Sequence, residues 1–568
     1  MIIEIQYTLL DDLRFLSEFL LDLDPLKNTV KILFECIIDR KRLIAESENV
    51  ENKERFVKKN LSQFLTRNVF AFSDISDLEE ENRHRLVKKE LRQVRDIINF
   101  QFIHAKRDVA SSEGGKNILS KLTTQYFNRN NKAATDFDSI NSLMLMMDLK
   151  LEETYKDFFE PFLNTSKTFL GIKDIKVISN LESNEILEDT SQIVYGSDQN
   201  YLPENFNGLG HMNILYLLLS IEIRKESFNK LNRGINLLFI EEPEAHTHPQ
   251  MQYVFANKIK LILKDIENLQ AFITTHSSHI VSQCDFEDIR YLRNMDGKTE
   301  LKNFHSELAS RYGDDTESFK FLEHFLTLDS CELFFANKVI FIEGITERIL
   351  LPYFIEQYDQ SMVADKEYIP LSSQNITVLE VGANAKAFRH FLDLLEIKTL
   401  VITDIDTTKS TVQKNKHDQE QTVYLASQVS QGNNTSNETI KHYFNAPKIA
   451  DLTFAQWFDD LRKGKLIPVS SYVRVAYQTE EKNYHGRSFE DAFIDLNRAL
   501  IEKKLDALEG LKNKKDFTSY VNAYELTEHI LDKKSAFASS LLFLALTDNA
   551  AKWMTPAYLK EGLEWISK

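Results

Sequence analysis

The chain has 568 residues, 43% of them hydrophobic and 27% charged, a composition typical of globular proteins with about two to four domains. Its net charge of −17 argues against non-specific coating of nucleic acid, although a local basic groove is still compatible with it. The three cysteines, Cys36, Cys284 and Cys331, are too far apart in sequence to form a zinc module. No apolar run reaches transmembrane length and no signal-peptide pattern opens the chain, so we expect a cytoplasmic protein with no membrane partner.

Residues 1 to about 110 open with a strand-like run, Ile2–Leu9, and continue in helical patterns. Within them, the acidic residues 79–81 precede a series of basic residues between positions 83 and 95. This order suits the dipole of one helix exposed to solvent, and contact with DNA is the alternative.

A helical insertion is predicted at about 115–180, because residues 134–169 have a helical pattern with a methionine-rich stripe. Such a stripe is more often core or oligomer interface than ligand site. The strand-like run 172–179 then returns the chain to a sheet.

Acidic and histidine residues follow two apolar runs in the stretch 200–290. Leu237–Ile240 predicts a buried strand that ends in Glu241 and Glu242, and 272–275 predicts a strand that ends at His276. A predicted helix at 250–265 joins them, which gives the strand–helix–strand unit of a parallel sheet. His246 and His248, on the turn between, are interpreted as turn or packing residues rather than ligands.

Upstream, Gly208, Gly210 and Asn213 form a glycine turn that opens an apolar helix. Together these motifs resemble the ABC-type ATPase core of the OLD (overcoming lysogenization defect), RecF and SMC proteins. The resemblance implies that Glu241 is the metal-linked Walker B acid, Glu242 the general base and His276 the switch histidine. It also implies that the glycine turn is a signature loop that reaches the nucleotide of a facing subunit.

The phosphate-binding motif G-x-x-x-x-G-K-[ST] is absent from the sequence. The nearest stretch, Glu113–Asn117, has Ala110 in place of the first glycine and no hydroxyl residue after Lys116. In the family this loop lies near the N-terminus, so we expect a shortened chain, a misassigned start or a partner that supplies the loop. ATP is accordingly expected as a cofactor only if that loop is supplied.

Two further apolar runs end in carboxylates in the C-terminal half. Lys338–Ile342 is followed by Glu343 and Glu347, and Thr399–Ile402 is followed by Asp404 and Asp406. Continuous apolar runs indicate strands buried on both faces of a parallel sheet, whose carboxyl ends bind ligands. If a helix follows the first run, Glu343 and Glu347 lie one turn apart on one side of it, and Asp404 and Asp406 share one face of an extended chain. Carboxylate oxygens are hard ligands, which favour binding of Mg²⁺, Mn²⁺ or Ca²⁺.

The rest of this half offers weaker signals. A third strand, 376–382, contains Glu380, which is a further candidate metal ligand, and it leads into a predicted helix at 386–395. The polar stretch from 407 to about 438 is predicted to be a long surface loop. Two later helices begin near Glu490 and near Lys534.

The E-G-x-x-E and D-x-D pair resembles the Toprim metal site of topoisomerases, some primases and OLD-family nucleases. The resemblance implies an α/β chain with an ABC-type ATPase domain at 1–325 and a Toprim domain at 330–568. It also implies that Glu490 helps to bind metal and that Lys534 stabilises the transition state. The expected activity is Mg²⁺- or Mn²⁺-dependent hydrolysis of DNA, in anti-phage defence of the Gabija-like type. The expected assembly is a dimer or dimer of dimers, with a helicase-like or other defence protein as a possible partner.

Two alternatives stay open. A topoisomerase-like, primase-like or DNA-repair Toprim enzyme is one of them, and covalent protein–DNA trapping would identify a topoisomerase. The other is a non-catalytic DNA-binding scaffold that regulates a partner, which would bind DNA or protein but cut nothing with any divalent metal.

Overall fold

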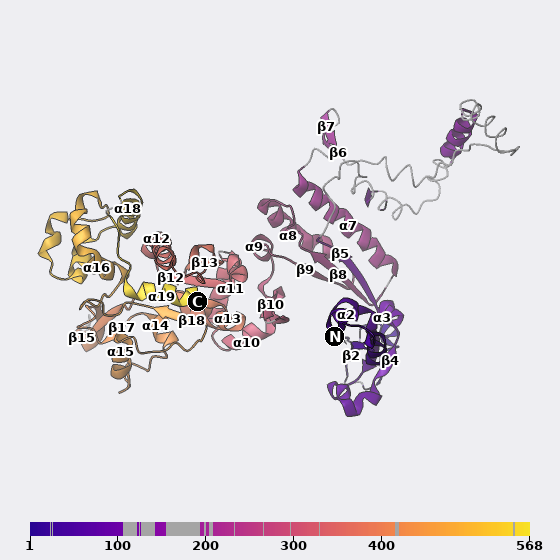
Figure 1. Cartoon of the computed structure of the whole chain (residues 1–568), viewed down its shortest axis with the longest axis horizontal. Helices are drawn as coiled ribbons and strands as arrows, with labels where there is room; N and C mark the ends of the chain where they lie inside the picture. Colours follow the sequence, from indigo (N-terminus) through magenta and orange to yellow (C-terminus); the bar gives the residue numbers. More distant parts are fainter. Residues whose placement is uncertain are drawn as a thin grey trace. The chain divides into compact units, whose positions relative to one another are not determined.

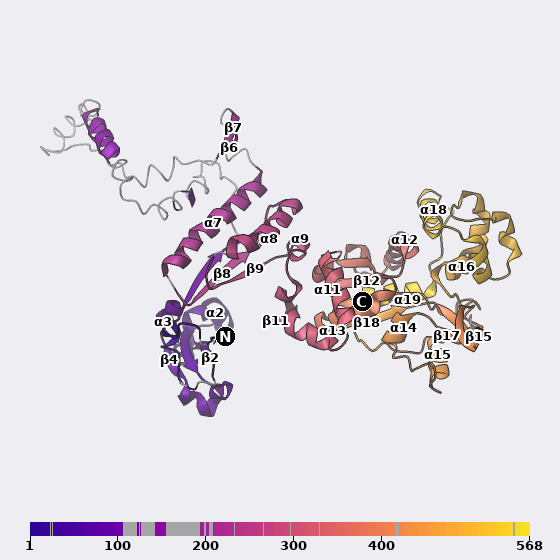
Figure 2. The same cartoon turned by 180° about the vertical axis from the view of Figure 1, so that it is seen from behind.

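The computed structural model describes 1–105 without 9, 23, 25 and 26; 122, 123 and 125; 142–154; 194–197; 200–203; and 208–568 without 232, 265, 296, 329, 415–419, 549 and 550. The chain divides into two compact units, Met1–Ile280 and Val281–Lys568. Each unit contains a parallel sheet with helices packed against it (Figures 1 and 2). No helix in these described ranges is long and apolar enough to cross a membrane.

The first unit begins with an antiparallel sheet. Its strands, in order, are β1 (Ile2–Gln6), β2 (Thr29–Ile38), β3 (Leu65–Phe72) and β4 (Val87–Lys89). The helical pattern predicted for this stretch was therefore wrong, because alternate residues of β2, such as Val30 and Ile32, are buried in strand periodicity.

The basic region between residues 83 and 95, which we interpreted as part of one solvated helix, is divided among several elements. That region contains a 3-10 helix at Glu80–Arg85, then β4, then α3 (Leu91–Ile97). The other short helices of this part are η1 (Leu13–Leu16), α1 (Arg40–Ser47) and α2 (Lys53–Asn60). The single-helix prediction failed because β4 pairs with β3.

The parallel sheet of the first unit has the order β5 (Ile98–Ile103), β8 (Ile235–Glu241), β9 (Leu269–Thr274). Helices α7 (Leu209–Leu231) and α8 (Pro249–Lys264) cover one face, where they pack on Leu238 and Ile240 (Figure 1). The predicted strand–helix–strand unit is present as β8, α8 and β9.

Little of the predicted insertion lies among the described residues. Residues 142–154 are helical, with Met144 buried and Met146 and Met147 exposed, and a hairpin of β6 (Val194–Ser197) and β7 (Asn200–Pro203) follows. The predicted strand at 172–179 and the stretch 113–117 fall outside the described residues.

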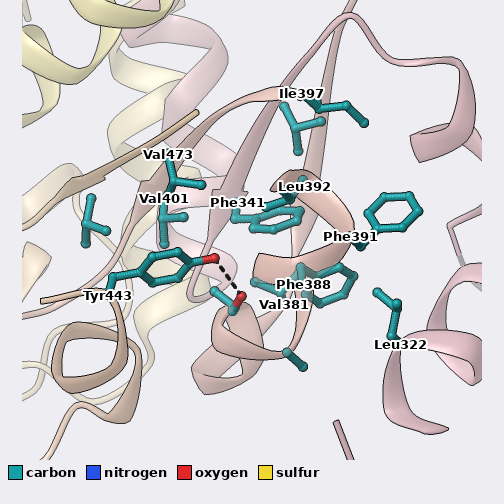
Figure 3. Close-up of a cluster of buried hydrophobic side chains, with 14 of the residues drawn as sticks. Leu322, Phe341, Val381, Phe388, Phe391, Leu392, Ile397, Val401, Tyr443 and Val473 are labelled. Atoms are coloured by element: carbon teal, nitrogen blue, oxygen red, sulfur yellow. Dashed lines mark hydrogen bonds between the residues drawn. The ribbon is translucent and has the colours of Figure 1, made fainter. Parts of the chain in front are cut away.

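The second unit is built on a parallel sheet in the order β13 (Ile376–Glu380), β12 (Lys338–Ile342), β14 (Lys398–Ile402), β18 (Val473–Ala476). Alternate residues of β12 and β14 enter two separate cores, as expected for strands buried on both faces. Figure 3 shows the first core, where Phe341 and Val401 pack near Phe388, and the hydroxyl of Tyr443 donates to the Ala385 carbonyl at 3.2 Å.

Helices cover both faces of this sheet. The first core is closed by α11 (Thr316–Leu328), α13 (Arg389–Leu395), α14 (Glu438–Tyr443) and α15 (Phe454–Arg462). The second is closed by α12 (Ile345–Met362), α16 (Phe489–Lys503), α17 (Ala523–Ile530), α18 (Lys534–Thr547) and α19 (Ala557–Ser567). Before α11 the chain forms the hairpin of β10 (Arg290–Met295) and β11 (Lys298–Asn303), a π-helix (Phe304–Leu308) and α10 (Ala309–Tyr312). A 3-10 turn, Cys331–Phe335, lies between α11 and β12. The predicted helix at 386–395 is a 3-10 segment, Gly382–Phe388, that continues into α13.

The polar stretch after Asp406 is not a loop, contrary to our prediction. It forms β15 (Thr407–Lys414), β16 (Glu420–Ala426) and the short β17 (Asn434–Thr435) in an antiparallel sheet. The β-branched threonine and valine residues in both long strands favour this conformation despite their polar neighbours.

Candidate active site

The carboxyl ends of β12 and β14 bring the predicted acids together. Glu343 directly follows β12, and its Oε2 accepts hydrogen bonds from Thr403 Oγ1 at 2.5 Å and from the backbone N–H of Asp404 at 3.0 Å. One turn further, Glu347 is 7% exposed in the first turn of α12. The two strand ends are thus joined directly through Glu343.

Each aspartate has its own set of donors. Asp404 Oδ1 accepts from Gln478 Nε2 at 2.7 Å and from the backbone N–H of Phe489 at 2.8 Å. Asp406 Oδ1 pairs with Arg487 Nη2 at 2.8 Å. The backbone φ of Asp406 is +46°, a left-handed conformation that aspartate tolerates better than most residues.

The structure also brings Glu490 and Lys534 to these carboxylates. Glu490, 3% exposed in the first turn of α16, pairs with Lys534 Nζ at 2.9 Å and accepts from Thr346 Oγ1 at 3.0 Å. Asp491, the other acid of this turn, forms a capping box with Ser488 and therefore has a structural role.

Burial and mutual repulsion change the protonation of this cluster. Burial, followed by the charge of Glu490, raises the pKa of Glu347 to about 8. Burial and the charges of Glu347, Glu490 and Glu343 raise the pKa of Asp404 well above its usual range. Burial also raises the pKa of Asp406, although Arg487 opposes the shift. The fully ionised form of the cluster is therefore disfavoured, because its neighbours do not neutralise the charge that full ionisation would create.

This donor set fits a hard divalent cation. Carboxylate oxygens are the ligands preferred by Mg²⁺ and Mn²⁺, and a cation would relieve the crowding that raises these pKa values. In the positions seen, no three carboxylate, imidazole or thiol groups among the described residues are close enough together to coordinate one ion. Glu343, Asp404, Asp406 and Glu490 are bonded to protein donors instead, so metal binding requires some of these carboxylates to turn.

The remaining candidate ligand, Glu380, does not join the buried cluster. It ends the edge strand β13, is exposed, and lies 3.6 Å from Arg348 Nη1. In the sheet Glu380 lies beside Ile342, but the edge strand leaves its last side chain in solvent.

Several supporting residues were missed by the sequence analysis. Gln478 is 1% exposed, and besides Asp404 it bonds to the Ile405 N–H and the Tyr558 hydroxyl. Asn437 donates to Thr403 Oγ1 at 2.6 Å and to the Asp404 carbonyl at 2.8 Å. Gln478 follows the short strand β18, which we did not predict, and no spacing in the sequence distinguishes this glutamine.

The position of Lys534 depends on Gly510. The Gly510 carbonyl accepts from the N–H groups of Asp532 and Lys533, just before α18. The backbone φ of Gly510 is +73°, and a Cβ there would lie 2.3 Å from the Lys533 carbonyl oxygen. Only glycine therefore fits this contact.

The parallel sheet of the first unit has a second acidic edge. Glu241 Oε2 accepts from the Ala105 N–H at 3.1 Å and lies 3.5 Å from His104 Nδ1. Glu242 has a φ of 38°, and its Oε1 lies 3.7 Å from His276 Nε2. The predicted Walker B acids and switch histidine are thus neighbours.

The residues of the predicted signature loop, Gly208, Gly210 and Asn213, differ in how closely they contact the rest of the chain. Asn213 is 2% exposed and donates to the Pro243 and Ala245 carbonyls of its own chain at 3.3 and 2.6 Å. A Cβ on Gly210 would lie 3.2 Å from the His246 carbonyl oxygen, whereas nothing lies within 4 Å of one on Gly208. The side chain of Asn213 thus holds the turn after β8, and its contact with a nucleotide of a facing subunit stays a prediction.

The two histidines on this turn have the structural roles that we predicted. His246 takes a left-handed φ of 61°, and His248 Nδ1 accepts from the Gln250 N–H at 3.3 Å at the start of α8.

Two family models match the chain. An AAA ATPase domain matches residues 12–281, and the Toprim domain of overcoming lysogenization defect-like proteins matches residues 334–406. The second match ends at Asp406 and includes Glu343, Glu347 and Asp404.

The chain is similar to three nucleases along different lengths. It is 26% identical to the endonuclease GajA of Bacillus cereus strain HuB5-5, over 90% of this chain and 82% of that protein. It is 24% identical to the OLD nuclease of Thermus scotoductus strain SA-01, over 48% of this chain and 53% of that protein. It is 21% identical to the Old nuclease of Escherichia phage P2, over 41% of this chain and 36% of that protein.

Proposed function

The chain joins an AAA ATPase domain to an OLD-type Toprim domain, and we propose that it is a divalent-metal-dependent DNA endonuclease in anti-phage defence. The observation that supports this most is the convergence of buried carboxylates with one lysine at the ends of β12 and β14. The nucleases to which the chain is similar support DNA as its substrate.

The acids of the cluster would bind the cation. Glu343, Glu347, Asp404, Asp406 and Glu490 are the ligands we propose, with Mg²⁺ or Mn²⁺ as the metal. When bound, such ions activate water and stabilise the leaving oxygen of a phosphodiester. These acids are numerous enough to hold two such ions, which would suit this reaction.

The other residues of the site position these acids and supply positive charge. Gln478 and the Phe489 N–H orient Asp404, while Arg487 orients Asp406. Lys534, an ammonium 2.9 Å from Glu490, would neutralise charge that develops on the phosphate oxygens. Although burial opposes it, the charge of Glu490 raises the pKa of Lys534, so the lysine stays protonated at neutral pH.

The tyrosines near this site do not favour a topoisomerase. The Tyr558 hydroxyl accepts from Gln478, and burial together with Asp404 raises its pKa far above its usual range. The Tyr484 hydroxyl donates to Asp491. Neither hydroxyl is placed to ionise and attack phosphorus.

The ATPase unit would have a regulatory role. Glu241, Glu242 and His276 are candidates for metal and water positioning at a bound nucleotide, and a phosphate-binding loop would have to complete the site. The exposed methionine and leucine side chains of helix 142–154 support self-association as a dimer or dimer of dimers. A helicase-like or other defence protein is the further partner that we propose.

A cleavage assay tests the function. Circular and linear DNA are incubated with the full chain in Mg²⁺, Mn²⁺, Ca²⁺ or EDTA, and the products are separated on gels. We expect cutting in Mg²⁺ or Mn²⁺ and none in EDTA. Binding without cutting in every metal would favour the scaffold alternative, and covalent protein–DNA products would favour a topoisomerase.

A further inference from the structure

β15 begins one residue after Asp406, and beyond Thr408, where β17 stops pairing with it, β15 and β16 form a two-stranded ribbon. They pair from Thr408 with Ala426 to Lys414 with Glu420. Exposed side chains lie on both faces of the ribbon, for example Val412 at 65% on one face and Leu425 at 48% on the other. Because a two-stranded ribbon in water is only marginally stable, this exposure favours a surface that contacts a ligand.

The base of the ribbon is fixed to the acid cluster. Arg487 pairs with Asp406 through Nη2 and donates from Nε to the Thr407 carbonyl at 3.1 Å. The Ser427 N–H donates to the same carbonyl at 3.1 Å, and Asn433 bonds to both the N–H and the hydroxyl of Ser410. The base of the ribbon is therefore held by Arg487, the same residue that orients Asp406.

We propose that this ribbon lies along duplex DNA beside the phosphodiester that is cut, an inference that rests on the proposed nuclease function. Of the eight residues of β15 and seven of β16, Glu420 is the single acid, in a chain with 86 acidic residues. Threonine, glutamine, lysine and tyrosine side chains are donors suited to phosphate and base edges. A two-stranded ribbon also fits the major groove of DNA.

The length of the ribbon gives a size for the contact. Eight residues of an antiparallel strand extend about 27 Å, which corresponds to about 8 base pairs of duplex. Substrates should therefore need about that much duplex on one side of the cut.

The test compares two double variants of the full chain. The first, Lys409→Glu with Gln413→Glu, alters one face of the ribbon. The control, Lys366→Glu with Gln360→Glu, makes the same exchanges near the far end of α12. Affinity for a fluorescent 40-base-pair duplex is measured by anisotropy in EDTA, so that nothing is cut, and thermal unfolding verifies the fold.

We expect the ribbon variant to bind about tenfold more weakly with a shallower salt dependence, and the control to bind like wild type. If the ribbon variant unfolds early, Lys409→Glu alone replaces it. Duplex binding that the ribbon variant leaves unchanged, or no binding by wild type, overturns the proposal.

Cleavage in Mg²⁺ separates this proposal from the proposed function. A wild-type protein that binds through the ribbon but never cuts would contradict the nuclease function and leave the ribbon contact standing. A wild-type protein that cuts, together with a ribbon variant that binds equally well, would leave the function and reject the ribbon.

Discussion

Both units end parallel strands in carboxylates, but the two edges differ in how completely they are enclosed. At the β12–β14 edge, Glu347 and Glu490 are 7% and 3% exposed, and Glu343 and Asp404 are bonded to fixed donors. At the β8–β9 edge, the side chains of Glu242 and His276 are 45% and 81% exposed, and their closest atoms are 3.7 Å apart.

The difference shows how far each edge is organised before a ligand arrives. Burial and crowding at the first edge disfavour the ionised form of the carboxylates, and a bound cation would reverse this by supplying positive charge. At the second edge the same residue types are solvated, so further groups must complete a binding site there. The predictions below test this contrast.

Loss of Asp404 should have the largest effect. Asp404→Ala removes a proposed metal ligand worth several kcal/mol, so we expect DNA cleavage to fall about a thousandfold. The fold should survive, because the change relieves repulsion among buried carboxylates. Glu380→Ala, at the exposed end of β13, is the matched control and should cut within about threefold of wild type. Wild-type cleavage rates in Asp404→Ala would refute the assignment.

Lys534 and its neighbour allow a controlled test of charge. Lys534→Met should lower the cleavage rate about a hundredfold at saturating Mg²⁺, because it removes the ammonium next to Glu490. Lys533→Met removes an exposed ammonium at the preceding position and should change the rate little. Single-turnover kinetics would measure both, and equal losses in the two variants would contradict a specific role for Lys534.

Gln478 should influence metal binding more than the chemical step. Gln478→Leu removes the donor to Asp404, so we expect the Mg²⁺ concentration for half-maximal cleavage to rise at least tenfold. The rate at saturating Mg²⁺ should recover to within a few fold. Titrations of Mg²⁺ would separate these effects, and a loss that no Mg²⁺ concentration rescues would indicate a different role.

The β8–β9 edge should matter little for DNA cleavage. We expect the chain alone to hydrolyse little ATP, since no phosphate-binding loop motif occurs in its sequence, and Glu242→Gln to cut DNA within twofold of wild type. Phosphate release and DNA cleavage would be measured on the same samples. Ordinary ATP turnover that Glu242→Gln stops would reveal an unrecognised phosphate cradle, with Gly114–Lys116 the first stretch to examine.

Asp359, a carboxylate outside both edges, should make a small contribution to the free energy of unfolding that depends on pH. Asp359 accepts from Tyr368, Leu371 and Ser372, and although burial opposes it, these bonds lower its pKa. The stabilisation is therefore present above the unfolded pKa of about 3.9 and is lost as the pH falls through the folded value.

Asp359→Asn should reduce the free energy of unfolding by about 1 kcal/mol at pH 7 and by less near pH 3, which is below the unfolded pKa. Urea unfolding at both pH values would measure this, with Asp365→Asn as the exposed control on the same connection. A difference of equal size at both pH values would contradict the role of the charge.

The parts of the fold that were predictable follow from continuous local patterns. The apolar runs of β12 and β14 predicted strands buried on both sides, and their final acids predicted the edge where Glu343 and Asp404 meet. Glu490 and Lys534 came from resemblance to a family, because an acid or a lysine at a helix start is common.

The supporting residues were not predictable in this way. Gln478 and Asn437 act through contacts with residues distant in sequence, and an amide after a strand or before a helix has no distinctive spacing. The antiparallel strands of the first unit were missed because Lys31 and Glu35 interrupt the apolar pattern of β2 on its solvent side.

The contact at Gly510 has a consequence for comparing distant relatives. The chain leaves Gly510, forms a 3-10 turn and α17, and returns so that Leu511 and Leu531 pair as an isolated bridge. Since this excursion is closed at its base, its length can change without moving the residue that opens α18. A divergent relative could have several lysines near the start of the helix that corresponds to α18. The glycine whose carbonyl accepts the backbone N–H groups just before that helix would then show which lysine is the counterpart of Lys534.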